Sequence, residues 1–426
     1  MKTLQTLMIV TLTLHSAAQS WTDVGEGFSY DVNALTVYNN SLYAGGFFIS
    51  SGNGSSAFHH VASWDGAAWS ATGSGMNNPV VALIDYDGSL YAGGAFDSAG
   101  GNASAFVAQY SGTDWTSVNA GASDPVENFC IYNYDLYAGG SFIYMDGGQA
   151  NYIARWNGSN WSNVGDGFNA NVEALANYDG YLYAGGDFYY SNNIYLANIA
   201  RWNGTVWDSV GAGLNGSVRA FAVYQGELYA GGYFTDEGSH IAKWNGTSWS
   251  PVGPGVNDNV FSMAVYNGEL YVGGDFTTAG GNAAMKIAKW DGANWSSLGS
   301  GMNASVFALA EYNNELYAGG DFTMAGGIQV HYIAKFILPT AVQQFSETEF
   351  SLYPNPVEDF INVDLKSGSE KILWYRMLNP IGKVMSEEKV TPASKLQLNM
   401  REYEQGIYFL EIETTMGKLR KLILKV

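Results

Sequence analysis

The chain contains one five-residue pattern, Leu-Tyr-x-Gly-Gly, seven times. The copies begin at Leu42, Leu90, Leu136, Leu182, Leu228, Leu270 and Leu316. Successive copies are therefore 48, 46, 46, 46, 42 and 46 residues apart. A near-constant period of this size is typical of repeat architectures, in which each unit buries its apolar face against its neighbours. The repeat therefore limits the fold class more strongly than any other feature of the sequence.

Each repeat reads as four short strands. In the last repeat, residues 306–312 and 315–322 form two apolar runs separated by Asn-Asn, and residues 332–336 form a third. In the preceding repeat the third run leads through Asp-Gly into a fourth at residues 294–298. Asn-Gly and Asp-Gly pairs favour positive φ and two-residue hairpins. Four strands joined in this way predict the blade of a β-propeller, and a glycine content of 53 in 426 residues disfavours long helices.

The fourth-run tryptophans give an independent count of blades. They are Trp21, Trp69, Trp115, Trp161, Trp207, Trp249 and Trp295. The first of them precedes any complete repeat, while the last repeat stops after its third run, so the N-terminal strand is expected to complete the last blade. Such closure leaves no unpaired sheet edge. We therefore predict an all-β fold, with a seven-bladed β-propeller over residues 19–340.

The repeated aromatic residues and glycines have structural explanations. The Trp and Tyr side chains are expected to pack between neighbouring blades. The Gly-Gly pair is expected to allow a close backbone approach or a bulge where the inner strands crowd together.

Gly-Gly at the end of the second run, an aromatic residue in the third and Trp in the fourth resemble the kelch repeat and the galactose-oxidase-type central propeller. The repeats are also similar to those of fungal cortical-marker proteins. The resemblance covers residues 21–336 and implies the propeller fold. It implies little about function, because propellers host both enzymes and binding modules.

The N-terminus reads as a secretory signal peptide over residues 1–18. Lys2 supplies the positive charge, residues 4–14 the apolar stretch, and Ser16-Ala17-Ala18 the small residues of a cleavage site. No run in the chain approaches the ~20 apolar residues that a transmembrane helix needs, so no transmembrane segment is predicted.

The C-terminal part differs in composition from the repeats. Residues 21–340 hold 27 acidic and 7 basic residues, whereas residues 341–426 hold 12 and 11. Residues 341–349 read as a linker. Short alternating runs with turn residues over 350–426 then predict a small Ig-like β-sandwich.

This C-terminal segment resembles the type A sorting domain of the type IX secretion system of Bacteroidota. The matching residues are Tyr353-Pro354-Asn355-Pro356, Gly382-Lys383, Gly406-Ile407-Tyr408 and the basic, apolar end at 418–426. The resemblance implies passage through the periplasm and recognition by the secretion machinery. It also implies removal of the sorting domain, which leaves the product on the outer-membrane cell surface or secreted. An accessory sandwich domain is the alternative.

The composition argues against a nucleic-acid partner and against a disulfide within the chain. Binding to nucleic acid requires clustered Lys and Arg, which the acidic propeller lacks, so no nucleic-acid partner is expected. The one cysteine, Cys130, cannot form an intramolecular disulfide. Other repeats carry small residues at its position, so we predict a buried packing thiol.

The sequence encodes no recognised catalytic motif. It lacks H-E-x-x-H, Cys/His metal spacing, the G-x-S-x-G elbow and the P-loop. The galactose-oxidase resemblance implies a copper site with a crosslinked Cys-Tyr pair, but Cys130 and the histidines do not follow that pattern. Asp187, Asp275 and Asp321 follow Gly-Gly, yet the other four repeats have no Asp there. We therefore assign no catalytic residue, metal or cofactor, and only isolated calcium sites remain open.

The loops between second and third strands vary most and are expected to share one face with the fourth-to-first connections. Variable loops on a rigid ring commonly carry function, and aromatic rings among Asn, Gly and Ser suit carbohydrate or protein ligands. The candidate ligand-binding residues are Phe58, His59, His60, Tyr144, Tyr152, Tyr189, Tyr190, Tyr195, Tyr233 and Tyr332, and Phe48 lies in the same loops.

The sequence therefore favours an exported, non-enzymatic binding module for a glycan or a protein. One alternative is an extracellular hydrolase or lyase acting on polysaccharide, which carboxylates clustered at the mouth of the channel would favour. Another is a structural component of an adhesin or gliding assembly. The sequence does not identify the ligand.

Overall fold

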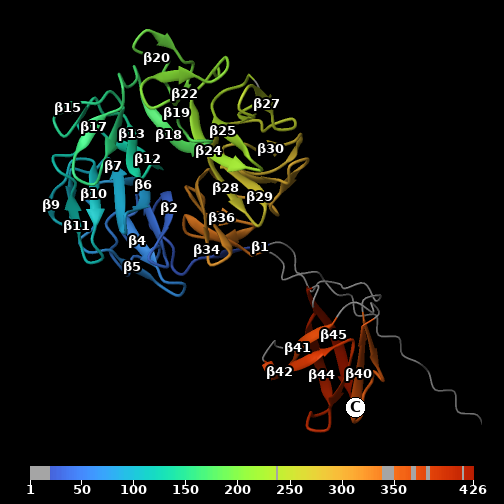
Figure 1. Ribbon diagram of the computed structural model, residues 1–426. Helices are drawn as coiled ribbons and strands as arrows, with labels where there is room; N and C mark the ends of the chain where they lie inside the picture. Colours follow the sequence, from blue (N-terminus) through green and yellow to red (C-terminus); the bar gives the residue numbers. More distant parts are fainter. Residues whose placement is uncertain (1–19, 237, 338–349, 366–370, 380–383, 415–416) are drawn as a thin grey trace, which may run out of the picture. The chain divides into compact units, whose positions relative to one another are not determined.

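Figure 1 shows a computed structural model of the chain, which describes residues 20–236, 238–337, 350–365, 371–379, 384–414 and 417–426. The expected signal peptide (1–18) and linker (341–349) lie outside these residues. The chain divides after Leu338 into two compact units, and each is considered by itself. No helix long and apolar enough to cross a membrane occurs in the described part of the chain.

The first unit is a ring of four-stranded antiparallel sheets, of which the described residues form seven (Figure 1). The first, innermost strands are β2 (Val32–Tyr38), β6 (Val80–Tyr86), β12 (Val126–Tyr132), β18 (Val172–Tyr178), β24 (Val218–Tyr224), β28 (Val260–Tyr266) and β34 (Val306–Tyr312). The second strands are β3 (Ser41–Gly46), β7 (Ser89–Gly94), β13 (Asp135–Gly140), β19 (Tyr181–Gly186), β25 (Glu227–Gly232), β29 (Glu269–Gly274) and β35 (Glu315–Gly320).

The outer half of each sheet holds the third and fourth strands. The third strands are β4 (Val61–Trp64), β10 (Val107–Tyr110), β16 (Ile153–Trp156), β22 (Ile199–Trp202), β26 (Ile241–Trp244), β32 (Ile287–Trp290) and β38 (Ile333–Ile337). The fourth strands are β5 (Trp69–Ala71), β11 (Trp115–Ser117), β17 (Trp161–Asn163), β23 (Trp207–Ser209), β27 (Trp249–Pro251), β33 (Trp295–Ser297) and, for the last blade, β1 (Ser20–Asp23).

Strand β1 closes the ring as the sequence predicts. It pairs antiparallel with β38, with Trp21 opposite Phe336. The inner strand β34 of this last blade lies beside β2 of the first blade. The all-β propeller of repeated four-stranded sheets is therefore confirmed, and the described residues form seven of these sheets.

A circle of tyrosine hydroxyls links each blade to the next. The last residue of every inner strand is Tyr, and its hydroxyl donates to a backbone carbonyl in the next blade's turn between first and second strands, over 2.8–3.2 Å. The bond from Tyr312 to the Asn40 carbonyl, 3.0 Å, joins the last blade to the first. One hydrogen bond of this kind contributes about 1 kcal/mol, and the repeated residue explains why every copy keeps it.

The Gly-Gly pair allows the backbone contacts expected of it. A Cβ on Gly45 would lie 2.6 Å from Val80 Cγ1 of the next blade, and one on Gly46 would lie 2.0 Å from the Asp31 carbonyl oxygen. Opposite the pair, the inner strand contains a β-bulge: Val32 pairs with Gly46 and Ala34 with Gly45, which leaves Asn33 unpaired. The same register shift occurs in all seven blades.

Large aromatic residues fill the space between blades, as predicted. Trp115, Trp207, Tyr183 and Tyr229 are among the largest fully buried side chains. Six of the seven fourth-strand indoles also donate to a backbone carbonyl near the end of the preceding fourth strand, as Trp207 does to Val164 over 3.0 Å. The same aromatic residues therefore form the hydrophobic core and the hydrogen bonds between neighbouring blades.

The hairpin between first and second strands has a different turn from the hairpin between third and fourth strands. The turn between first and second strands is a two-residue turn with positive φ at both positions, as at Asn39 and Asn40. The prediction of two-residue hairpins is wrong for the Asn-Gly and Asp-Gly pairs between third and fourth strands. There Trp64 pairs with Trp69, which leaves a four-residue turn. The Asp65 side chain accepts from the amides of Ala67 and Ala68 at 2.8 Å and holds this longer turn.

The loops between second and third strands share one face of the ring with the fourth-to-first connections, as expected. Bridges such as Phe28 to Ser51 and Met76 to Ala99 join the two kinds of segment. We call this the loop face, and the face with the two-residue turns the turn face. Five of these loops contain small hairpins, formed by β8 (Ser98–Ala99) with β9 (Asn102–Ala103), β14 (Tyr144–Met145) with β15 (Gly148–Gln149), β20 (Tyr190–Ser191) with β21 (Ile194–Tyr195), β30 (Thr278–Ala279) with β31 (Asn282–Ala283), and β36 (Met324–Ala325) with β37 (Ile328–Gln329).

The second unit is a β-sandwich, as predicted. One sheet has the order β39-β40-β43 and the other β42-β41-β44-β45. Phe350, Ile361, Leu410 and Ile423 are among the buried residues of the core between them. The strands are β39 (Phe350–Tyr353), β40 (Phe360–Leu365), β41 (Ile372–Leu378), β42 (Val384–Ala393), β43 (Lys395–Asn399), β44 (Gly406–Thr414) and β45 (Gly417–Lys425).

Candidate binding site at the channel mouth

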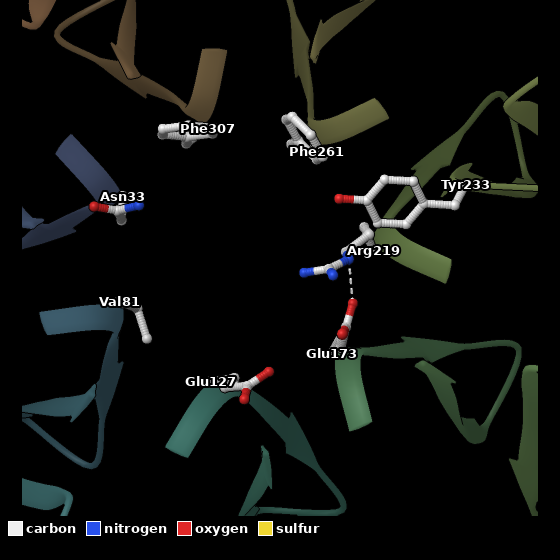
Figure 2. Close-up of a pocket in the computed structure, with 8 residues that line it drawn as sticks. All are labelled: Asn33, Val81, Glu127, Glu173, Arg219, Tyr233, Phe261 and Phe307. Atoms are coloured by element: carbon white, nitrogen blue, oxygen red, sulfur yellow. Dashed lines mark ion pairs between the residues drawn. The ribbon is translucent and has the colours of Figure 1, made fainter. Parts of the chain in front are cut away.

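The bulge in each inner strand contributes one side chain to a cavity at the centre of the ring. The cavity has a volume of about 300 Å³ and lies where the inner strands begin, which is the loop-face end of the channel. We call it the channel mouth. Figure 2 shows its lining side chains around one open space. They are Asn33, Val81, Glu127, Glu173, Arg219, Phe261 and Phe307 from the seven bulges, and Tyr233 from the loop after β25.

The bulge position is far more variable than its neighbours within the chain. Every inner strand begins with Val and ends with Tyr, whereas the bulge holds Asn, Val, Glu, Glu, Arg, Phe and Phe. The fold therefore fixes the flanking residues and leaves the bulge residue free. A position that the fold does not specify, and that points into a cavity, is where a ligand-specific set of side chains can be placed.

Glu173 and Arg219 form an ion pair on one side of the mouth. The Glu173 side chain is only 5% exposed, and it also accepts from the Ser217 hydroxyl at 3.3 Å. Burial raises the pKa of Glu173 to about 8, although Arg219 acts in the opposite direction. Asp187 and Glu127 add to the rise by repulsion. Glu173 is therefore a carboxyl group that holds a proton near neutral pH more readily than an ordinary one.

Glu127 lies next to this pair and points toward the opening in Figure 2. Its carboxylate accepts a hydrogen bond from the Ser141 hydroxyl. Burial raises the pKa of Glu127 as well, while the Ser141 bond and the charge of Arg219 lower it. Among the described residues no cation lies within ion-pair distance of Glu127, and Arg219 acts on its carboxylate only at longer range.

Aromatic rings line the opposite side of the mouth. The Arg219 guanidinium lies 4.9 Å from the centre of the Tyr233 ring, a cation–π distance. Tyr233 in turn contacts Phe261 at 6.0 Å between ring centres, and Phe261 contacts Phe307 at 5.7 Å. The mouth thus combines carboxylates and one cation on one side with a continuous aromatic wall on the other (Figure 2).

Two of the candidate residues, Phe58 and His60, are buried in the loop of the first blade, together with Phe48. Phe58 is 2% exposed and packs edge-on against Phe28, and Phe48 is completely buried in the same cluster. His60 is 9% exposed, and its Nδ1 lies 3.0 Å from the Gly46 carbonyl oxygen. Burial lowers the pKa of His60. These side chains hold the base of the first blade's loop, whereas His59 is exposed.

His60, Tyr152 and Tyr332 occupy one repeat position, directly before the third strand. All three have positive φ, between 63° and 74°. Their amides donate to Phe48, Phe142 and Phe322 carbonyls over 2.7–3.2 Å. Tyr332 also stacks on Tyr30 at 5.9 Å. This position therefore has a structural task in every blade.

Tyr144, Tyr189, Tyr190 and Tyr195 lie on the hairpins of two consecutive blades. They are between 44% and 55% exposed. Tyr195 packs against Tyr190 at 5.4 Å and against Tyr189 at 6.4 Å. These three rings form an exposed aromatic group on β20–β21, outside the channel mouth. Of the ten candidate residues, only Tyr233 lines the mouth.

Most of the mouth is made of bulge residues, which are not among the candidates predicted from the sequence. The signal that could have identified them is the mixture of charged, amide and aromatic residues at the position after the invariant Val, although later positions of the strand vary as well. A period-2 pattern does not identify these residues, because a bulge changes which side chains of the strand face inward. The bulge is visible only in the strand register.

Two other residues considered for chemistry, Cys130 and Asp275, are buried, hydrogen-bonded or ion-paired within the fold. Cys130 is a buried free thiol, as predicted, and burial raises its pKa to about 12. Asp275 accepts from the Ser305 hydroxyl and lies 3.6 Å from Lys286 Nζ. Within the described residues, no three His, Cys, Asp or Glu side chains are placed to share a metal ion. Isolated calcium sites remain a prediction.

The sorting motif lies in the second unit, except that Gly382 and Lys383 fall outside the described residues. Asn355 joins the Tyr353–Pro356 segment to β45: its Nδ2 donates to the Leu422 carbonyl, and its Oδ1 accepts from the Leu424 amide, both at 2.8 Å. Pro354 and Pro356 flank it, and Tyr353 is 48% exposed. Gly406 begins β44, where Ile407 is 43% exposed and Tyr408 is 9% exposed.

Several solved structures are similar to the chain at low identity. A computationally designed protein, Ika8, shares 15% identity at a TM-score of 0.44 and covers 96% of this chain and 100% of its own. The structure of U3-55K has 12% identity, a TM-score of 0.48 and coverages of 75% and 98%. The WD40 repeats of RRP9 have 11% identity, a TM-score of 0.46 and coverages of 74% and 99%. No curated protein matches the chain.

One family model matches the C-terminal unit. Residues 351–425 match the secretion system C-terminal sorting domain. The match covers the sandwich described above, including the Tyr353–Pro356 segment and β44. The chain therefore carries a C-terminal sorting domain of the type IX secretion system, which implies export to the cell surface or beyond.

Proposed function

We propose that the exported propeller is a binding module that takes a glycan at the channel mouth. The observation that carries the proposal is the bulge position, where seven otherwise similar repeats present seven side chains to one cavity. Carboxylates, an amide and a guanidinium can bond to sugar hydroxyls, while aromatic rings offer flat apolar surface to the face of a sugar ring.

Strand register supports the use of the loop face. Ile337, the last described residue of the propeller, pairs with Ser20 and lies near Glu315, next to a two-residue turn. The inner strand β34 begins at the opposite end, where Val306 pairs with Gly320. The last described residue of the propeller therefore lies on the turn face, away from the mouth.

The direct test is a glycan array probed with the purified full chain, compared with the double variant F261A/F307A. Removing both rings is expected to weaken binding by at least about tenfold, because each ring contributes stacking area. The matched control is Tyr134→Ala, which removes a ring that is 94% exposed in a turn-face hairpin. Equal binding by all three proteins would contradict the proposal, as would the absence of any bound glycan.

A second candidate function is hydrolysis of a polysaccharide. It is favoured by the two carboxyl groups, Glu127 and Glu173, that line one cavity. Burial raises the pKa of Glu173 to about 8, and a general acid must hold its proton at the working pH. The test is release of reducing ends from a polysaccharide panel by the wild type and by Glu173→Gln. Release that the substitution abolishes would support hydrolysis, and no release from any substrate would remove this candidate.

A further inference from the structure

Two carboxyl groups, those of Glu127 and Glu173, and one cation, Arg219, line the channel mouth. Asp187 adds negative charge near both carboxyl groups, and Arg219 acts on both of them as a cation. Arg219 is already engaged with Glu173 and with the Tyr233 ring. Glu127 therefore keeps acceptor capacity that faces the opening (Figure 2).

A second acidic group lies at the loop-face end of the blades across the ring. Burial raises the pKa of Asp31, and repulsion from the Asp321 carboxylate raises it further. Asp321 Oδ1 is a buried oxygen without a hydrogen-bond partner. Lys286 is the cation here, and it contacts Asp275.

These charges disfavour an anionic ligand. A uronate or sulfate group in the cavity would lie close to the Glu127 carboxylate and to Asp187, which directly follows β19, and both charges repel an anion. A cation would instead be attracted by these carboxylates. It would also interact favourably with the aromatic rings of Tyr233, Phe261 and Phe307. The acidic charge of the propeller adds long-range attraction for such a ligand.

We infer that the glycan of the channel mouth carries a free amine, and that the fitting class is an oligosaccharide of 2-amino-2-deoxy sugars. The ammonium contacts the Glu127 carboxylate, which Ser141 orients, and the sugar ring lies against Phe261 and Phe307. Asn33 and the Tyr233 hydroxyl are available for the sugar hydroxyls. This inference rests on the proposed glycan binding and adds the charge of the ligand.

The aromatic wall and the mixed polar lining favour a sugar over a lysine-rich peptide. A lysine side chain needs only a carboxylate and a narrow apolar sleeve. The mouth instead offers a cavity of about 300 Å³ with an amide, a phenol, a guanidinium and two carboxylates around it. That set matches a compact ring with several hydroxyls.

The test is isothermal titration of the full chain with a glucosamine tetramer and with its N-acetylated counterpart, near neutral pH and at low salt. The two probes share hydroxyls and ring shape, and only the first carries positive charge. We expect the amine form to bind about tenfold more tightly, the worth of one partly buried ion pair. Added salt should reduce that preference.

Glu127→Gln keeps the shape of the site and removes the charge, so it should abolish the preference while the neutral tetramer still binds. Asp187→Asn, at an exposed position, is the second variant and should reduce the preference in part. Melting curves of both variants establish that they fold. F261A/F307A should weaken both tetramers equally.

Each outcome separates the inference from the proposed function. Equal or tighter binding of the N-acetylated tetramer, with loss in F261A/F307A, would overturn the charge inference and leave glycan binding standing. Binding of a lysine-rich peptide in place of either tetramer would overturn the inference, as would failure of both tetramers to bind.

Discussion

At the scale of single residues, Glu173 connects the site to the stability of the fold. Burial raises its folded-state pKa to about 8, above the ordinary 4.5 of the unfolded chain. Between these values the folded state binds more protons than the unfolded state, so the free energy of unfolding falls as pH rises. Its contribution to stability is largest below the unfolded pKa and is lost progressively up to the folded one.

Glu173→Gln is therefore expected to flatten the pH dependence of stability. The wild type should melt at a lower temperature at pH 8 than at pH 5, and the variant should show a smaller difference because its amide does not titrate. Glu127, whose pKa is also raised, accounts for part of what remains. Thermal melts of both proteins across this range make the measurement, and parallel curves for the two would contradict the account.

The second glycine of each Gly-Gly pair gives a prediction about backbone packing. A Cβ on Gly186 would lie 2.0 Å from the Asn171 carbonyl oxygen, and rigid backbone cannot yield that space. Gly186→Ala should therefore destabilise the propeller by about 3 kcal/mol. Denaturant unfolding measures the change.

Gly148→Ala is the matched control for Gly186→Ala, since its Cβ would meet nothing closer than the Met145 carbonyl oxygen at 3.6 Å. It should change stability by less than about 0.5 kcal/mol. A similar loss in both variants would mean that glycine is needed for flexibility rather than for the close approach.

At the scale of elements, strand β1 replaces a missing fourth strand in the last blade. Trp21 is 4% exposed, and its indole donates to the Leu298 carbonyl at 3.4 Å. Without β1 the outer edge of β38 would be unpaired, and unpaired edges promote association.

Deleting residues 20–23 should therefore lower the melting temperature and produce oligomers on size-exclusion chromatography. Loss of the Trp21 side chain alone accounts for about 3–5 kcal/mol. Thr22→Ala, which keeps the strand and changes a half-buried side chain, is the control and should remain monomeric and stable. A deletion variant as stable as the control would show that the ring closes without this strand.

Sequence periodicity predicts the elements better than the site. The Tyr that ends each inner strand, the Gly-Gly pair and the fourth-strand Trp recur because packing and ring closure need them in every blade. Ligand-binding residues need not recur, so a repeat pattern carries no signal for them. Glu127, Glu173 and Phe261 became visible only when the bulges placed them in one cavity.

The composition of a loop predicts its place in the binding site less well than the position of the loop in the fold does. Phe58 and His60 belong to aromatic loops, yet both serve the packing of their own blade. Tyr233 differs because its loop borders the channel mouth, where its ring lies next to the Arg219 guanidinium. The resemblance to kelch and galactose-oxidase-type propellers remains a prediction.

At the scale of the whole molecule, the C-terminal unit determines where the propeller is delivered. Residues 351–425 match a sorting domain, and Asn355 ties its Tyr353–Pro356 segment to β45. Removing residues 341–426 should leave the propeller in the periplasm of a bacterium that has a type IX secretion system. Fractionation and surface labelling make the comparison, and surface exposure of the truncated chain would contradict the sorting role.

The account rests most heavily on the channel mouth as the binding site. The most direct measurement is hydrogen–deuterium exchange of the full chain with and without saturating glucosamine tetramer. The account predicts slower exchange at the first residues of β12, β18, β24, β28 and β34 and in the loop after β25. Protection confined to the Tyr189–Tyr195 hairpin or to the turn face would place the ligand elsewhere and contradict it.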